Sequence, residues 1–319
     1  MEKKRSFWEK PWGLKEGFAI GAGIIIAGLV LEASIGPVVW EVLVWPANIV
    51  LLGCFVLLIL IGHFLRRKVH LFSYLATYKA AVPTLSYAVV LTVIMGVTRQ
   101  KVNGRWLNDM LSFWPFVLIY VYITFMLGLL VFKRLSLLFK HSAKTVLKTD
   151  IPFLLNHLGL FLTLACAVAG NGDKQDWKVT TQVGETEWRG LDDYGKVKEL
   201  DIAIELKKFI MEEYPSESGK RRMPKRFASE VQIYTKSGKN ISATVDVNKP
   251  LEVDGWKIYQ YGYDEEKGTE SDISILELVK DPWLGFVYAG IWMMIAGAAC
   301  LLLFIKGKDS ETEIKEERV

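Results

Sequence analysis

The chain has 319 residues, of which 51% are hydrophobic and 12% aromatic, and its formal net charge is +4. A single soluble core of this length uses much less apolar side chain, which excludes a wholly soluble globular protein. No nucleotide-binding loop, dinucleotide fingerprint, zinc-protease motif or serine-hydrolase motif occurs, and the charge gives no argument for nucleic-acid binding.

Six apolar runs are long enough to cross a hydrocarbon layer of about 30 Å, and in lipid only a helix satisfies the backbone of such a run. They lie at 17–34, 46–65, 80–98, 113–132, 151–170 and 283–305. The first run could also be a cleaved signal peptide, because the basic residues before it precede an apolar stretch. No small-residue cleavage site follows it, so we expect this helix to remain.

Positive charges in the connections predict the orientation. Three connections are basic, and we place them on the cytoplasmic side: Lys3, Lys4 and Arg5; Arg66, Arg67, Lys68 and Lys79; Lys133, Arg134, Lys140, Lys144 and Lys148. The connection that contains Arg99, Lys101 and Arg105 falls on the opposite side and counts against this scheme. Most of these basic residues fit the scheme, which places residues 171–281 outside and the tail from Lys306 inside.

Local signals mark two helix starts and several membrane edges. Asp150 before Ile151-Pro152 and Asp281 before Pro282 each offer an N-cap and a proline in the first turn. Tryptophans that we expect at the membrane edges are Trp40, Trp45, Trp106, Trp114 and Trp283. The three cysteines lie in different apolar runs without a Cys-x-x-Cys pair, and we interpret them as buried hydrophobic residues: Cys54, Cys166 and Cys300.

Residues 171–281 are charged and show period-two apolar alternation, which predicts antiparallel strands. The clearest stretches are Ile202/Ile204/Leu206, Val231/Ile233, Val245/Val247, Trp256/Ile258 and Ile273/Ile275. Turn signals separate them at Ser237-Gly238, Asp254-Gly255 and Lys267-Gly268. The expected fold is therefore an α-helical polytopic membrane protein with an inserted, extracytoplasmic, antiparallel β-rich domain.

Two of the four histidines fall in or at the edge of predicted helices. His157 lies about 9 Å into the layer, six residues into a helix that rises about 1.5 Å per residue, and His63 lies near the same face. Ionisable groups in a membrane are costly and usually face the bundle interior. A neutral imidazole can be an axial ligand of haem iron, but either histidine could instead bond within the bundle, and His63 could reach the interface.

The remaining polar candidates have structural alternatives. We expect His70 and His141 to be solvated in basic loops. Asn156 could cap a helix, bond across helices or orient His157, and an interhelical bond is favoured. Tyr259, Tyr261 and Tyr263 share one face of a predicted strand, where a ladder that stabilises the sheet is favoured over ligand stacking.

The second half of the chain resembles the ResB (CcsB) family of cytochrome c biogenesis proteins. The resemblance covers 151–305 and is carried by Asn156-His157-Leu158-Gly159, Asp201-Ile-Ala-Ile-Glu-Leu-Lys-Lys-Phe209, Phe227-Ala-Ser-Glu-Val-Gln-Ile233, Val247-Asn-Lys-Pro-Leu251, Gly255-Trp-Lys-Ile-Tyr-Gln-Tyr-Gly-Tyr263 and Val279-Lys-Asp-Pro-Trp283. Typical members have four membrane helices. The third and fourth helices, with Tyr78-Lys-Ala-Ala-Val-Pro83 and Ser112-Phe-Trp-Pro115, look like the longer arrangement of ResB-like proteins from the Bacteroides group.

This resemblance implies a subunit of the System II cytochrome c synthase, which conveys haem across the cytoplasmic membrane and assists its attachment to apocytochrome c. Family members use a transmembrane histidine in this route, and the resemblance points to His157 first and His63 second as axial ligands. Haem b would be a transient cargo. The implied partners are a membrane subunit resembling CcsA or ResC, apocytochrome c, membrane lipid and the thioredoxin-like thiol reductant of the pathway.

The expected organisation has three parts: 1–170 with five membrane helices, 171–281 as the β-rich domain, and 282–319 as the last helix and a cytoplasmic tail. No catalytic residue and no metal other than haem iron is predicted. The resemblance implies an accessory subunit of a haem-attaching complex that is not active alone, because this sequence lacks the tryptophan-rich segment and the outer histidine ligands of the CcsA- or ResC-like partner. Two other functions stay open. One is a non-catalytic membrane scaffold for the synthase partner, and the other is transport of a different solute.

Overall fold

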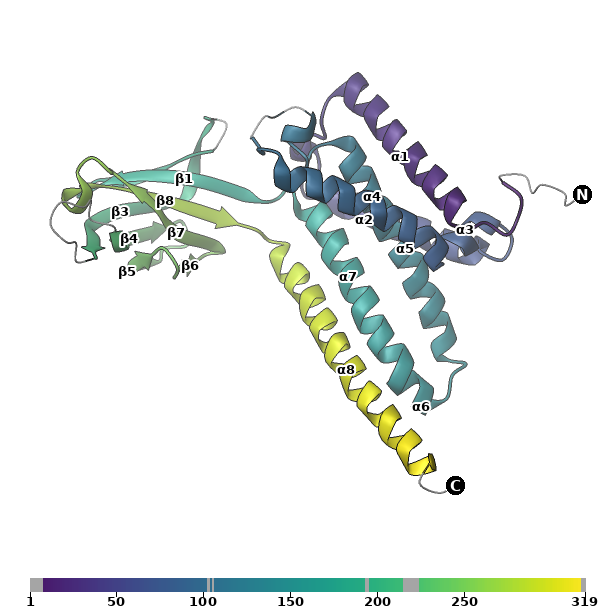
Figure 1. Ribbon diagram of the computed structural model, residues 1–319. Coiled ribbons are helices and arrows are strands. Elements are labelled where there is room, and N and C mark those ends of the chain that lie inside the picture. Colours follow the sequence, from purple (N-terminus) through teal and green to yellow (C-terminus); the bar gives the residue numbers. More distant parts are fainter. Residues whose placement is uncertain (1–7, 102–103, 105, 193–194, 215–223, 317–319) are drawn as a thin grey trace, which may run out of the picture. The chain divides into compact units, whose positions relative to one another are not determined.

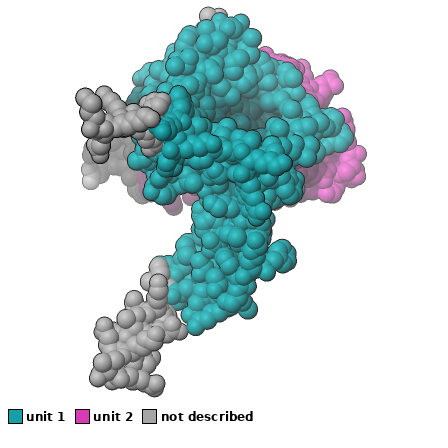
Figure 2. Space-filling model, turned by 90° about the vertical axis from the view of Figure 1, so that its right-hand side faces the viewer, with its two compact units in different colours: residues 1–173, 283–319 teal, residues 174–282 magenta. Residues whose placement is uncertain are grey.

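The computed structural model describes residues 8–101, 104, 106–192, 195–214 and 224–316. Lys3, Lys4, Arg5 and Arg105, which entered the charge argument, lie outside the described residues. The chain divides into two compact units, residues 1–173 with 283–319 and residues 174–282 (Figure 2). We call them the membrane unit and the barrel unit.

In the part of the membrane unit that the structure describes, six helices are long and apolar enough to span a bilayer, so the chain is a multi-pass membrane protein. The described helices of this unit are α1 (Leu14–Ile35), η1 (Trp40–Val42), α2 (Ala47–Leu65), α3 (His70–Leu75), α4 (Tyr78–Val97), η2 (Trp106–Asn108), α5 (Trp114–Leu138), α6 (Ala143–Thr145), η3 (Val146–Asp150), α7 (Ile151–Gly170) and α8 (Leu284–Glu316) (Figure 1). The α8 backbone continues beyond the predicted end of the last run at residue 305.

Helix α5 is the centre of the bundle. It packs against α1, α2, α4 and α7, while α8 packs along α7 (Figure 1). Its buried residues include Phe116, Ile119, Ile123, Met126 and Leu129, which recur at helical spacing. The position of α5 therefore decides which side chains of α2 and α7 are enclosed.

Contacts at one end of the bundle join the connections that the sequence identifies as basic. Arg66 after α2 donates to the Ser136 hydroxyl of α5 at 3.2 Å, and Tyr74 of α3 donates to the Gly13 carbonyl before α1 at 2.8 Å. We call this the basic end. At the other end α7 stops at Gly170 and α8 begins at Leu284, and the chain leaves for the barrel unit. We call this the domain end.

The predicted cap at Asp150 is wrong, although α7 begins at Ile151 with Pro152 in its first turn. Asp150 has helical backbone angles and makes no capping hydrogen bond, because the chain is already helical through α6 and η3 from residue 143. The last membrane helix begins at Leu284, two residues after Pro282, so that proline is not its first helical residue.

The barrel unit is one antiparallel sheet of eight strands in the order β5-β4-β3-β2-β1-β8-β7-β6, curled into a nearly closed barrel (Figure 1). The strands are β1 (Gln175–Gln182), β2 (Thr186–Leu191), β3 (Val197–Glu213), β4 (Pro224–Thr235), β5 (Asn240–Asp246), β6 (Leu251–Val253), β7 (Trp256–Tyr263) and β8 (Ile273–Lys280). The edge strands β5 and β6 are consecutive in the chain, and a bridge between Asp246 and Lys249 forms a tight turn where their connection begins.

The barrel core follows the predicted alternation on most strands. Ile202, Ile204 and Leu206 are almost fully buried, as are Val231 and Ile233 on the neighbouring strand. The three predicted turns are also confirmed, and Gly238, Gly255 and Gly268 there have positive φ angles, which glycine adopts without strain. The expected class, helices that span a membrane with an antiparallel β domain, is therefore confirmed.

Candidate functional site

His157 is half-buried on α7, and its neighbours determine which ring nitrogen carries the proton. Its Nδ1 lies 2.8 Å from the carbonyl oxygen of Phe153, one turn earlier in the same helix. A carbonyl only accepts, so Nδ1 must be the protonated nitrogen and the neutral ring keeps its lone pair on Nε2. No described residue hydrogen-bonds Nε2. This is the arrangement of a metal-ligating histidine, whose other N–H donates to a carbonyl or carboxylate.

An ion cluster begins on the far side of Phe153. The Phe153 ring stacks on His157 with centroids 3.9 Å apart, and the Arg134 guanidinium of α5 lies 4.8 Å from the same ring. Arg134 also pairs with Asp150 at 2.5 Å, and His141 Nδ1 lies 2.7 Å from the other carboxylate oxygen. The Asp150 side chain is 0% exposed, so both partners are needed to offset the burial of its charge.

The expectation of a solvated His141 is therefore wrong, and Asp150 serves as an ion-pair partner where a helix cap was expected. The sequence identifies His157 but not Phe153, Arg134 or Asp150 as its surroundings. A backbone carbonyl carries no residue-type signal, and the pairing of Arg134 with Asp150 depends on how α5 and the start of α7 pack.

His63, near the end of α2, has the opposite arrangement. Its Nδ1 lies 3.0 Å from Nη1 of Arg66, and a guanidinium only donates, so Nδ1 must accept. A neutral ring then carries its proton on Nε2. His63 would have to release Arg66 before either nitrogen could bind iron, so the two histidines are not equivalent candidates.

The two candidate histidines contact different parts of α5. The His63 ring lies 6.2 Å from Phe132, whereas His157 reaches Arg134 through Phe153. Residues two apart on a helix do not face the same side. Among the described residues no hydrogen bond or ring contact joins the two imidazoles, and no cluster of three or more His, Cys, Asp or Glu side chains could hold a metal ion.

The other polar residues that the sequence singled out have structural partners. Asn156 donates to the carbonyl of Pro152 at 2.8 Å and packs against Gly297 of α8, so it neither bonds across helices nor orients His157. The His70 ring contacts Trp12 with centroids 5.2 Å apart, and its Nε2 is buried, so the expectation of a solvated His70 is wrong.

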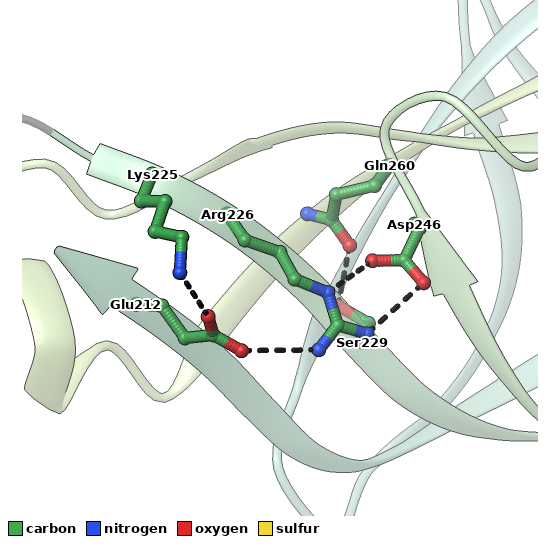
Figure 3. A network of polar contacts seen from close by, with 6 residues as sticks. All are labelled: Glu212, Lys225, Arg226, Ser229, Asp246 and Gln260. Atoms are coloured by element: carbon green, nitrogen blue, oxygen red, sulfur yellow. Dashed lines mark hydrogen bonds and ion pairs between the residues drawn. The ribbon is translucent and has the colours of Figure 1, made fainter. Parts of the chain in front are cut away.

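The barrel interior contains a buried polar cluster of its own. Ser229 donates to Oε1 of Gln260 at 2.6 Å (Figure 3), and Gln260 Nε2 donates to Ser274 Oγ at 3.0 Å. On β4, Arg226 binds Asp246 of β5 at 2.7 Å and Glu212 of β3 at 3.2 Å, which ties these three strands together (Figure 3). These groups satisfy one another, so we interpret the cluster as structural.

The three tyrosines of β7 do not share one face. The register shifts between Gln260 and Gly262, and a bulge of this kind turns the following side chain to the other face. Tyr261 is exposed with Lys178 4.6 Å from its ring, whereas Tyr263 stacks on the buried Phe209 at 5.2 Å. The prediction of a tyrosine ladder along this strand is therefore wrong.

Comparison with known proteins gives a match to one family model and distant likenesses to solved structures. Residues 142–275, which include His157 and the strands from β1 into β8, match the model of the ResB-like family. Among solved structures, one described as Cytochrome c Heme Lyase CcmF aligns with 91% of this chain and 44% of its own length, at 13% identity and a TM-score of 0.38. The chain thus spans less than half of that protein, and the likeness is too distant to bear on function. No curated protein sequence matches the chain.

Proposed function

We propose that this protein is a haem-handling subunit of a System II cytochrome c synthase, which conveys haem across the cytoplasmic membrane and assists its attachment to apocytochrome c. The observation that carries the proposal is the free Nε2 of His157, whose Nδ1–H donates to the Phe153 carbonyl, within the region that matches the ResB-like family. The relation of that family to cytochrome c biogenesis supports haem as the cargo. The lone pair on Nε2 of His157 supplies an atom that can bind the haem iron.

Each part of the chain has a defined task in this proposal. His157 would offer Nε2 to haem iron near the basic end, and the Phe153 ring fixes the plane of the imidazole by stacking on it. Arg134 is committed to Asp150, so its task is to hold α5 and α7 together beside the site. His63 is the second candidate and would act only after Arg66 moves.

The barrel unit is proposed to lie on the outer side of the membrane, where apocytochrome c is met. The support for this side is the excess of Lys and Arg in the connections at the basic end. A membrane subunit resembling CcsA or ResC and the thiol reductant would complete the synthase. This chain has no predicted catalytic residue, so attachment would depend on that partner.

Absorption spectra of the protein purified with its partner subunit test the ligand assignment. Wild type should show a Soret band, and His157→Gly should weaken it, with recovery on addition of imidazole to fill the space. His70→Gly is the matched control, because His70 lies outside the site. His63→Gly should leave most of the band in place. An unchanged spectrum in His157→Gly would contradict the ligand assignment.

One observation favours a non-catalytic scaffold as the second candidate: His63 and His141 both bond to side chains of the bundle. Under that function, deletion of the gene would reduce the amount of the synthase partner, and His157→Gly would leave both the partner and haem unaffected. Transport of another solute would predict normal c-type cytochromes after deletion. Loss of all c-type cytochromes with b-type haem intact would exclude that alternative.

A further inference from the structure

The ion pair with Asp150 occupies only one side of the Arg134 guanidinium. Nε of Arg134 lies 2.5 Å from Oδ1 of Asp150, and both atoms are buried. The Arg134 side chain as a whole is 22% exposed, and no described residue accepts a hydrogen bond from its two terminal nitrogens. A guanidinium carries several N–H donors in a fork that matches a carboxylate. Most of the donors of Arg134 are therefore available to a ligand.

The Phe153 ring connects Arg134 with the candidate iron ligand. It stacks on the His157 imidazole with centroids 3.9 Å apart and 16° between the planes, and the guanidinium carbon of Arg134 lies 4.8 Å from its centre. The lone pair on Nε2 lies in the imidazole plane, so a porphyrin whose iron binds there stands perpendicular to both rings. One edge of that porphyrin then points past Phe153 toward Arg134.

The charges around Arg134 favour an anionic group. Asp150 is the only acidic residue in the connections at 66–79 and 133–150, where Lys and Arg recur. Its side chain is 0% exposed and its second oxygen lies 2.7 Å from Nδ1 of His141, so a ligand meets the exposed part of the guanidinium and not this carboxylate. When His141 is protonated, the cluster has two cations and one anion, and a carboxylate bound at Arg134 balances the charge.

Arg66 gives a comparison at the same end of the bundle. Its Nη1 lies 3.0 Å from Nδ1 of His63, and its Nη2 donates to the Ser136 hydroxyl at 3.2 Å. Both of its terminal nitrogens are thus in use beside the second candidate histidine. Available guanidinium donors and a free imidazole nitrogen occur together at His157.

We propose that the terminal nitrogens of Arg134 bind one of the two carboxylates of haem while Nε2 of His157 binds its iron. Haem carries both carboxylates on one edge and is apolar elsewhere, so a single axial ligand leaves the ring free to turn about the iron–nitrogen bond. A carboxylate held at Arg134 stops that rotation and directs the acidic edge of haem toward the basic end. This role rests on the function proposed above, and it makes Arg134 the group that distinguishes haem from a porphyrin without free carboxylates.

Titration with two porphyrins tests this role. The protein is purified with its partner subunit from haem-limited cells, and haem b or its dimethyl ester, in which both carboxylates are uncharged, is added while the Soret band is followed. Wild type should bind haem about tenfold more tightly than the ester, the effect of one hydrogen bond between charged groups. Arg134→Met with Asp150→Asn removes the cation without leaving a buried charge unpaired. This double variant should bind both porphyrins equally, with an unchanged band position.

Lys140→Met is the matched control, because it removes an exposed cation from the same connection and should keep the tenfold preference. Thermal unfolding of each variant shows that a changed preference is not loss of fold. Equal affinity of wild type for the two porphyrins, or the same preference in the double variant, would overturn the role of Arg134 while the band still depends on His157. Absence of a band that depends on His157 would overturn the proposed function and this role together.

Discussion

At the residue scale, a neutral histidine can bind a metal only through the nitrogen that lacks a proton, and its neighbours decide which one that is. The Phe153 carbonyl leaves Nε2 of His157 free, whereas Arg66 occupies the acceptor nitrogen of His63. Both residues look alike in the sequence, as single histidines near the same membrane face. The difference between them comes from a backbone atom and from an arginine one turn away.

The buried carboxylate beside this site gives a test of how the basic end is held together. Arg134→Met should lower stability by about 3 kcal/mol, because breaking a buried pair leaves an uncompensated charge on Asp150. His141 remains as one partner, which keeps the loss at the low end of that range. The thermal unfolding midpoint in detergent, compared between Arg134→Met and wild type, measures this loss of stability.

Arg134→Met combined with Asp150→Asn is the control, because the neutral amide removes the charge without changing the shape of the side chain. It should recover most of the lost stability. If the double variant is as unstable as Arg134→Met alone, the loss comes from packing against Phe153 and the charge argument fails.

A second carboxylate, that of Glu187 in β2, makes the folding stability depend on pH. Hydrogen bonds from the Arg189 guanidinium, against the opposing effect of burial and with help from the amides of Arg189 and Trp188, lower the pKa of Glu187 to about 2. Its ordinary value is 4.5, so the unfolded chain takes up a proton here at higher pH than the folded chain does. The stability from this group is complete above pH 4.5 and is lost as pH falls toward 2.

Glu187→Gln should therefore be less stable than wild type at neutral pH, and the difference should shrink as pH falls from 4.5 to about 2. Comparison of the two chains at each pH removes the titration of other acids. Thermal unfolding, followed by the β-sheet signal in circular dichroism, measures the difference in stability. A difference that stays constant over this range would mean that the carboxylate charge does not act on folding.

At the element scale, the close approach of α7 and α8 depends on small residues. A Cβ at Gly290 would lie 2.6 Å from the carbonyl oxygen of Gly159 and would also meet the Thr163 hydroxyl. Contact between membrane helices relies on such positions, because lipid is as apolar as the side chains that it replaces. Helix α8 is therefore fixed to α7 by shape.

Gly290→Leu should separate the two helices and lower stability by about 1–3 kcal/mol or more, the usual cost of overpacking. Gly285→Leu is the matched control on α8, since a Cβ there meets no atom within 4 Å. Thermal unfolding, together with protease sensitivity of the C-terminal segment, measures both variants. Equal behaviour of the two would contradict a role for this contact.

The strands show where residue pattern stops predicting structure. Helical runs and the strands with one apolar face, such as β3 and β4, follow from periodicity. On β8 both faces are apolar, and the structure buries Ser274, Leu276 and Leu278 where the pattern pointed to Ile273 and Ile275. Strands β1 and β2 were not predicted. They pair at Lys178 and Leu191, and a bulge interrupts β2.

At the scale of the whole molecule, six spans and an inserted antiparallel domain follow from composition and charge, because lipid permits so few backbone structures. The site was predictable only in part. His157 stands out as an ionisable group in a membrane helix, but the positions of Arg134 and Asp150 beside it depend on how α5 and the start of α7 pack.

The orientation of the molecule is the remaining prediction, and single cysteines can test it. Cys54, Cys166 and Cys300 are first replaced by Ala, and one cysteine is then placed at Lys236 in the β4–β5 turn or at Lys140 after α5. Both positions are exposed. A membrane-impermeant maleimide added to spheroplasts should label Lys236→Cys directly and Lys140→Cys only after permeabilisation, because Lys and Arg at the basic end favour the cytoplasmic side. The reverse pattern would place the barrel unit inside and would remove the outward direction of haem on which the proposed function depends.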